Sequence, residues 1–279
     1  MMCGLGLNKF IAGTLDGARK NIVFNKQLTI NQAIDEIHNQ GGIAFAAHPG
    51  SNSGFLQFLF LHRGTWTQND ITHNLDGFQG LNSGFDSSWH NAKLLWIKSL
   101  QSGLRLPLLG GNDAHGDFNR YRAISIPFVN IHEDFERFMG AGKTGIYGKI
   151  KSRNDILNCI RNGATFVTTG PYISINYTES PDSCAISTTD ITPNKETLCV
   201  HAVSSCDSGT LQKVKIYSGT YGSENEKLLL SINCPKDCYE ILKAFDIKSI
   251  AKPSYIRAET QSLLNGTTYQ ACTSACFIG

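Results

Sequence analysis

The sequence has few charged residues and no long apolar segment. Charged side chains make up 17% of its 279 residues, and 25 basic and 23 acidic residues leave a formal charge of +2. A typical globular domain has roughly 25% charged residues. The near-neutral balance argues against a partner as acidic as nucleic acid, and the 41% hydrophobic content argues against general disorder. The longest strongly apolar stretch, 55–61, is much shorter than the roughly 20 residues that span a bilayer. We therefore expect neither nucleic acid nor membrane as a partner.

The first six residues also lack two features of a secretory signal. They contain neither a basic segment nor a sustained apolar segment. We expect no export signal in this chain, which makes the cytoplasm the default location.

Histidine is scarce in one part of the chain and cysteine in the other. Seven of the eight histidines precede Gly170, and seven of the nine cysteines follow it. Because imidazole both binds metals and titrates near neutral pH, the first part is the expected place for metal or acid-base chemistry. We predict two domains, covering residues 1–170 and 171–279.

Three segments of the first domain repeat one pattern, in which a capped amphipathic helix ends at a glycine and a short apolar strand follows. The expected helices begin at Thr29, near Ser88 and at Ser152. Gln32 and Asp155 complete capping boxes in the first and third helices. Ile30 and Ile156 belong to the apolar faces that these two helices should bury. The expected strands cover residues 42–47, 106–109 and 164–168, with a further candidate at 76–82.

Alternating helices and buried strands favour an α/β architecture with a parallel sheet, either a barrel or a doubly wound sheet. In both architectures, ligands bind beyond the C-terminal ends of the strands. His48 follows one expected strand, and Asp113 and His115 follow another. After Pro171 the pattern changes to short alternating segments separated by polar turns. That pattern predicts antiparallel strands and a small β-sandwich.

Asp113 and His115 are two residues apart, so an extended backbone would direct both side chains to the same side. With His48 they supply three nitrogen or oxygen ligands. A catalytic zinc site uses that number and keeps a position for water. The same spacing is also typical of an ordinary turn, which is the simpler interpretation of these residues alone.

Three motifs together resemble the PHP (polymerase and histidinol phosphatase) superfamily, and more narrowly its metallohydrolases of the carbaryl-hydrolase type. The motifs cover residues 46–49 (Ala-Ala-His-Pro), 110–116 (Gly-Gly-Asn-Asp-Ala-His-Gly) and 156–171. Residues 254–259 also resemble the closing strand of the β domain in that group. The resemblance covers most of the chain, and the motifs occur in the family's order.

The resemblance implies an α/β fold, a distorted β/α barrel that is incomplete here, followed by a small antiparallel β-sandwich. It implies that His48, Asp113 and His115 bind a divalent metal ion (zinc, manganese or iron). Asn82 occupies the place of a family Asn that follows an acidic residue, although the acidic position here is Gln79. The family's opening histidine ligands should precede a segment like Leu-Gly-Leu-Asn, which begins here at residue 5.

The function implied by the resemblance is metal-dependent hydrolysis, most simply of a small-molecule phosphate or other ester by metal-activated water. Arg122 and Arg161 are each able to hold an anionic group of the substrate with two hydrogen bonds, although pairing at the surface or between strands is the simpler role for both. Asn82 could also contact the substrate. The alternative is an inactive remnant that binds a partner protein through its β-sandwich. A third interpretation is that an upstream segment or another polypeptide completes the barrel.

The cysteines leave several possibilities open. Cys234 and Cys238 are four residues apart, as are Cys272 and Cys276, and both spacings are compatible with a structural zinc site of four cysteines. Buried thiols or disulfides would fit the same positions. The odd total of nine excludes a set in which every cysteine forms an internal disulfide.

Overall fold

The computed structural model describes nine stretches of the chain, namely residues 2–11, 28–51, 66–72, 74–112, 123–126, 129–132, 140–178, 197–246 and 255–278. The structure is 43% strand and 19% helix. Within these stretches, no helix has both the length and the apolar character needed to cross a membrane.

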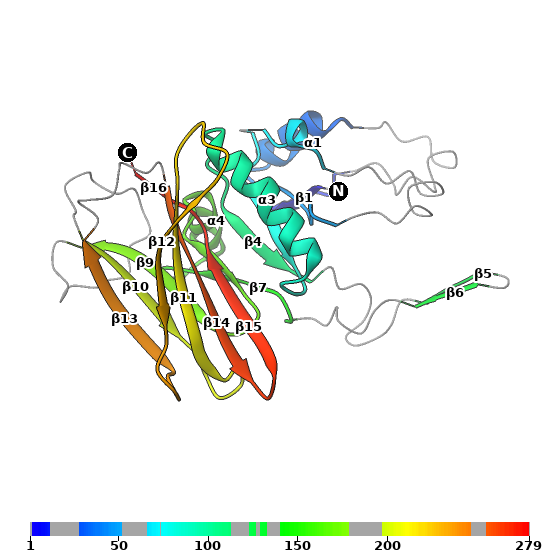
Figure 1. Ribbon diagram of the computed structural model, residues 1–279. Coiled ribbons are helices and arrows are strands. Elements are labelled where there is room, and N and C mark those ends of the chain that lie inside the picture. The colour runs from blue at the N-terminus through cyan, green and yellow to red at the C-terminus, as the bar shows by residue number, and fades with distance from the viewer. Residues whose placement is uncertain are drawn as a thin grey trace.

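A small four-stranded sheet forms the N-terminal part of the fold (Figure 1). Its strands, in spatial order, are β1 (Met2–Leu5), β2 (Ile43–Ala46), β3 (Gly77–Asn82) and β4 (Leu108–Gly111). β1 runs antiparallel to β2, whereas β2, β3 and β4 are parallel neighbours. All residues of β2 and β3 are buried, as expected for parallel strands that are covered on both faces.

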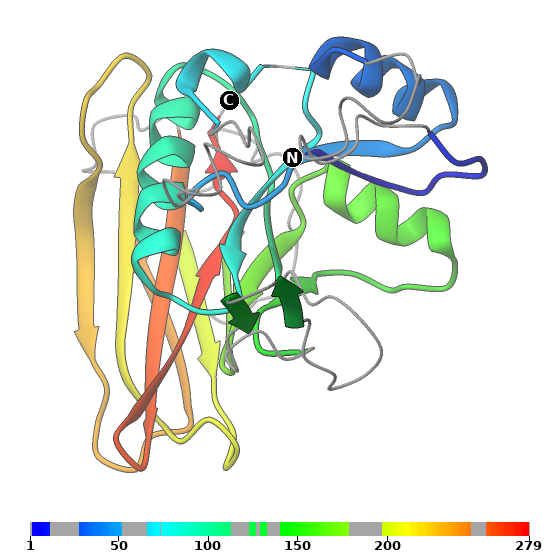
Figure 2. The same ribbon diagram turned by 90° about the vertical axis from the view of Figure 1, so that its right-hand side faces the viewer.

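Three helices surround this sheet, with α3 and α4 on opposite sides of it (Figure 2). They are α1 (Ile30–Asn39), α3 (Ser87–Gln101) and α4 (Arg153–Arg161), and a short 3-10 helix, η2, covers Gln68–Asp70. The predicted capping boxes of α1 and α4 are confirmed. α3 begins one residue earlier than predicted, because Asp86 accepts a hydrogen bond from the Trp89 N–H and acts as its cap. Ile30 and Ile156 lie at the margins of their helical faces and are 40% and 37% exposed, so their predicted burial is wrong.

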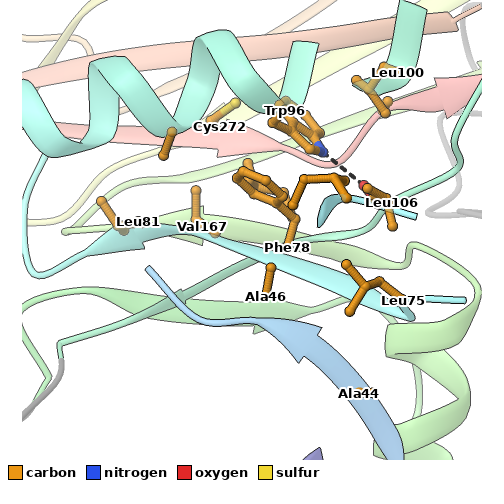
Figure 3. Close-up of a cluster of buried hydrophobic side chains, with 14 of the residues drawn as sticks. Ala44, Ala46, Leu75, Phe78, Leu81, Trp96, Leu100, Leu106, Val167 and Cys272 are labelled. Atoms are coloured by element: carbon orange, nitrogen blue, oxygen red, sulfur yellow. Dashed lines mark hydrogen bonds between the residues drawn. The ribbon is translucent and has the colours of Figure 1, made fainter. Parts of the chain in front are cut away.

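The largest buried cluster lies between α3 and the small sheet (Figure 3). Trp96 is fully buried there against Phe78, and its indole N–H donates to the Leu106 carbonyl at 2.8 Å. A second cluster covers the opposite face of the sheet, where α4 packs on β2 and β4. Its members are Ile43, Phe45, Leu109, Leu157 and Ile160. Odd and even residues of β2 therefore pack on different helices, as the alternation of a strand requires.

Two antiparallel sheets make up most of the remaining structure. The larger contains, in order, β12 (Lys227–Asn233), β11 (Thr210–Gly219), β14 (Tyr255–Leu264), β15 (Thr267–Thr273), β8 (Thr165–Thr168) and β7 (Lys143–Ile146), with β16 (Cys276–Phe277) beside β14. The smaller contains β13 (Glu240–Asp246), β10 (Thr197–Val203) and β9 (Tyr172–Thr178). An apolar cluster from both sheets includes Val200 and Val214. A separate hairpin consists of β5 (Ala123–Ile126) and β6 (Val129–His132).

The predicted β/α barrel is wrong. Strands outweigh helices by more than two to one, and most of the strands pair antiparallel. The strand expected at 164–168 does not extend the parallel sheet, because β8 pairs antiparallel with β15 and with β7. The seven-stranded sheet therefore combines strands from both sides of residue 170. The antiparallel pairing predicted after residue 171 is present.

The small sheet ends at β4 because side-chain hydroxyl groups occupy the outer edge of that strand. Leu108 N–H donates to Ser274 Oγ at 2.8 Å, and Leu108 O accepts from Thr165 Oγ1 at 2.9 Å. The Thr144 hydroxyl hydrogen-bonds Gly110 in the same way. Leu108 and Gly110 are two residues apart, so their backbone groups point to the same side of the strand. A further parallel strand has no free backbone groups to pair with at these residues.

Candidate functional site

The C-terminal ends of three parallel strands lie at one edge of the small sheet. β2 ends at Ala46, two residues before His48, and β3 ends at Asn82. β4 ends at Gly111, which is the register partner of Asn82. Parallel strands place their C-terminal ends at the same edge, where α/β proteins bind ligands. We refer to His48, Asn82, Ser83, Gly111 and Asn112 as the strand-end cluster.

His48 belongs to a tight turn that is held by α3. Its φ of 34° lies in the left-handed region, and its Nε2 atom is buried. Ser51 N–H donates to the His48 carbonyl at 3.0 Å, and Ser51 Oγ is 3.4 Å from Ser88 Oγ at the start of α3. A Cβ atom at Gly50 would lie 2.1 Å from Ser88 O, so only glycine allows this approach. The first turn of α3 thus fixes the position of the His48 turn.

Asn82 carries a buried acceptor with no donor. The residue is 6% exposed, and among the described residues nothing donates a hydrogen bond to its Oδ1 atom. Leaving such a group unsatisfied costs about 1–3 kcal/mol. An uncompensated acceptor at the end of a parallel strand is therefore a candidate ligand-binding atom.

Ser83 connects the ends of β3 and β4. Its N–H donates to Gly111 O at 2.8 Å, and its hydroxyl donates to Asn112 O at 3.1 Å. The φ of Ser83 is 77°, a left-handed conformation that costs a non-glycine residue of order 1–3 kcal/mol. Strained residues of this kind cluster at functional sites. His48 and Ser83 place two of them after neighbouring strands.

Gly142 closes over the same strand ends and is a residue that sequence reasoning missed. A Cβ atom there would lie 2.7 Å from Gly111 O and 3.0 Å from Ser83 O. In the sequence, residues 142–144 (Gly-Lys-Thr) invite comparison with a phosphate-binding loop. That comparison fails, because position 137 is Arg where the loop requires Gly. Only the tertiary contact reveals why Gly142 has to be small.

Of the predicted site residues, the structure brings His48 and Asn82 to one edge of the sheet. Asp113, His115 and Arg122 lie outside the described residues. Asn112, which immediately precedes Asp113, belongs to the strand-end cluster and accepts the Ser83 hydroxyl. Within the described stretches, no three His, Cys, Asp or Glu side chains lie close enough together to hold one metal ion. The four-cysteine zinc site considered for Cys234, Cys238, Cys272 and Cys276 is therefore not assembled.

Comparison with known proteins assigns no family, since no protein-family model, curated protein or solved structure matches this chain.

Proposed function

We propose that this protein is a metal-dependent hydrolase, most simply a phosphoesterase that acts on a small-molecule ester. In this proposal His48, Asp113 and His115 bind a divalent metal ion, zinc, manganese or iron. Asn82 and Arg122 contact the substrate. The proposal rests on the strand-end cluster and on the resemblance of the surrounding motifs to the PHP superfamily, and it does not require a barrel.

The observation that carries the proposal is the position of Asn82 Oδ1. This buried acceptor has no donor among the described residues. Asn82 ends β3, which lies between β2, the strand that precedes His48, and β4, the strand that precedes Asp113. An imidazole, a carboxylate and a second imidazole are the ligand types of catalytic zinc sites. The residue types therefore fit a divalent cation, and in the sequence all three residues follow β2 or β4 within a few positions.

A divalent cation bound there would lower the pKa of a coordinated water and supply hydroxide near neutral pH. The protein's own residues would orient the reactants. The Gly50 contact with α3 would hold the His48 turn in place, while the two Ser83 hydrogen bonds would hold the segment that leads to Asp113. Asn82 Oδ1 would accept a hydrogen bond from a substrate hydroxyl or from the attacking water. Arg122 would pair with the anionic group of the ester.

The direct test of function is turnover of an aryl phosphate ester by the purified chain with added Mn²⁺ or Zn²⁺. We expect metal-stimulated hydrolysis that a chelator abolishes. His115→Gln should reduce kcat/KM by at least about 100-fold, because it removes a proposed ligand. His201→Gln is the matched control, because His201 lies in β10 and pairs with Glu240 at 2.8 Å, away from the strand-end cluster.

Turnover that is equal in the His115 and His201 variants would contradict the proposed site. Metal-independent turnover would contradict the proposed chemistry. A chain that shows no hydrolysis of phosphate mono- or diesters would instead support the alternative, a binding module without catalytic activity.

A further inference from the structure

The turn between β12 and β13 carries two cysteines that the proposed function does not use. β12 is an edge strand of the seven-stranded sheet, and β13 is an edge strand of the three-stranded sheet. Residues 234–239, Cys-Pro-Lys-Asp-Cys-Tyr, connect them. Both thiols are free, and both side chains are partly exposed to solvent. A covalent link here would therefore close the connection between the two sheets.

A β-bulge in the neighbouring strand β11 fixes the backbone of both cysteines. The register of β11 against β14 shifts between Leu211 and Lys213. Cys234 N–H donates to Gln212 O at 2.9 Å, and Leu211 N–H donates to Cys238 O at 2.7 Å. Two successive residues of β11 thus hold the two ends of the turn. A bulge makes this arrangement possible, because it turns backbone groups of successive residues to the same side.

The two thiols interact directly. Burial, charge repulsion from the neighbouring Cys238 thiol and a hydrogen bond with that thiol together raise the pKa of the Cys234 thiol to about 11. Asp237 supports the sharp turn between them with a φ of 58°, a conformation that Asp tolerates better than most residues. Both cysteines also pack against the apolar cluster between the two sheets, so the turn holds the two side chains on the same side of the chain.

The same part of the chain already contains an oxidised cysteine. Cys199, in the adjacent three-stranded sheet, is disulfide-bonded. Cys206 provides a contrast, since its exposed thiol contacts the carboxylate of its neighbour Asp207. Cys272 and Cys276 both pair with β14, but their partners there, Glu259 and Ile256, are three residues apart. The backbones of Cys234 and Cys238 are instead held by two successive residues of β11.

We infer that Cys234 and Cys238 are a thiol–disulfide site that cross-links the β12–β13 turn. The oxidant is a small disulfide of the glutathione type. The Cys234 or Cys238 thiolate attacks one sulfur of the small disulfide and displaces one thiol, which takes up a proton. The second cysteine then attacks the mixed disulfide and displaces the other thiol. One S–S bond breaks and one forms, two S–H bonds move to the small thiols, and the cysteine pair loses two electrons.

The cross-link would stabilise the junction of the two sheets by restricting the unfolded chain. The closed loop contains only five residues, so the gain is at the low end for disulfides. We expect the melting temperature to rise by about 2–6 °C when the pair is oxidised. Because the pKa of Cys234 is raised, exchange should accelerate as the pH increases.

Peptide mapping tests the inference directly. The full chain is equilibrated with reduced and oxidised glutathione at several ratios, its free thiols are alkylated, and it is digested with trypsin. Lys236 lies between the two cysteines, so cleavage places them on the separate peptides 228–236 and 237–243. We expect these peptides to be recovered joined, with a mass two hydrogen atoms below their sum, at oxidising ratios. Dithiothreitol should separate them.

Two variants act as controls. Cys206→Ser should leave the joined peptides unchanged. Cys238→Ser should abolish the joined peptides. The melting temperature of this variant should be the same under oxidising and reducing conditions, apart from the contribution of the Cys199 disulfide. Separate alkylation of Cys234 and Cys238 at every glutathione ratio would overturn the inference. Stable glutathione adducts at either residue, without a cross-link, would overturn it as well.

Discussion

The hydroxyl of Thr144 makes two hydrogen bonds to Gly110, because Thr144 Oγ1 accepts from the Gly110 N–H and donates to the Gly110 carbonyl, each at 2.8 Å. Thr165 and Ser274 act in the same way on Leu108, and their own hydroxyl oxygens are 2.7 Å apart. Three side-chain hydroxyls therefore occupy the edge of β4 that a further strand would otherwise use. This is how the small parallel sheet joins the large antiparallel one.

Thr165→Val removes a hydroxyl from this junction and changes the side-chain shape little. Both Leu108 O and Ser274 Oγ would lose a partner in a buried position. We expect the free energy of unfolding in urea to fall by about 1–3 kcal/mol. Thr268→Val, at an exposed position of β15, should change it by less than about 0.5 kcal/mol. Equal effects of the two substitutions would show that the hydroxyl junction contributes nothing.

Gly142→Ala tests the packing over the strand ends. The added methyl group would contact Gly111 O and Ser83 O, so the ends of β3 and β4 would have to move. We expect a loss of about 1–3 kcal/mol in stability together with a fall in metal-stimulated turnover. Gly84→Ala is a matched control, because nothing lies within 4 Å of a Cβ atom at that position. If Gly142→Ala turned over substrate at the wild-type rate, the Gly142 contact would have no role in the function of the site.

Asn82→Leu distinguishes a functional acceptor from a structural one. Since Asn82 Oδ1 has no donor among the described residues, its removal should leave stability unchanged or raise it by up to about 1 kcal/mol. Turnover should nevertheless show a KM at least about tenfold higher, because a hydrogen bond to the substrate is lost. Ser174→Ala is the control, since Ser174 Oγ is also buried without a partner in the described structure but lies in β9. Ser174→Ala should change the stability as little as Asn82→Leu does, and it should leave KM unchanged.

Arg257 anchors a buried charge network between α3 and the large sheet. Its guanidinium is 2.5 Å from both Glu226 Oε2 and Glu259 Oε1, and Glu259 also pairs with Lys93 of α3 at 3.1 Å. Burial opposes ionisation of Glu259, but attraction to Arg257 and Lys93 outweighs it and holds the pKa of this carboxyl below its ordinary value. The Arg257 side chain is 2% exposed, so water screens these contacts weakly.

This lowered pKa gives a stability that depends on pH. The contribution of Glu259 should be fully present above its unfolded pKa of about 4.3 and should be lost as the pH falls through the lower folded value. Urea unfolding between about pH 3 and 7 should show this decline. In Glu259→Gln we expect lower stability at neutral pH and a shallower decline in acid. If the stability of Glu259→Gln declined in acid as steeply as that of the wild type, the decline would come from other carboxyl groups.

Local signals in the sequence predicted the helices well and their assembly poorly. The caps at Thr29 and Ser152 have unambiguous partners three residues later, whereas Asp86, Ser87 and Ser88 are all good caps, so the start of α3 could not be resolved. β7 begins at Lys143 and contains Gly145, so its four residues lack the alternation of apolar and polar side chains that predicts a strand. The way in which β4 joins the large antiparallel sheet depends on hydroxyl groups that are far apart in the sequence. Periodic patterns of apolar residues do not predict such contacts.

For the candidate site, sequence order was enough to place His48 and Asn82 at the ends of neighbouring strands, because parallel strands share one C-terminal edge. The sequence could not indicate that Asn82 Oδ1 is buried without a donor, or that Gly142 packs against Ser83. Both features depend on which segments surround the strand ends. Such contacts become visible only in three dimensions.

Calorimetric titration of the metal-free protein with Zn²⁺ or Mn²⁺ tests the central claim most directly. The proposed site predicts stoichiometric binding that weakens by at least about tenfold in Asp113→Asn, because a ligand carboxylate is lost. Asp207→Asn, in the turn before β11, should bind as the wild type does. Absence of stoichiometric binding, or equal affinity in the wild type and Asp113→Asn, would contradict the account.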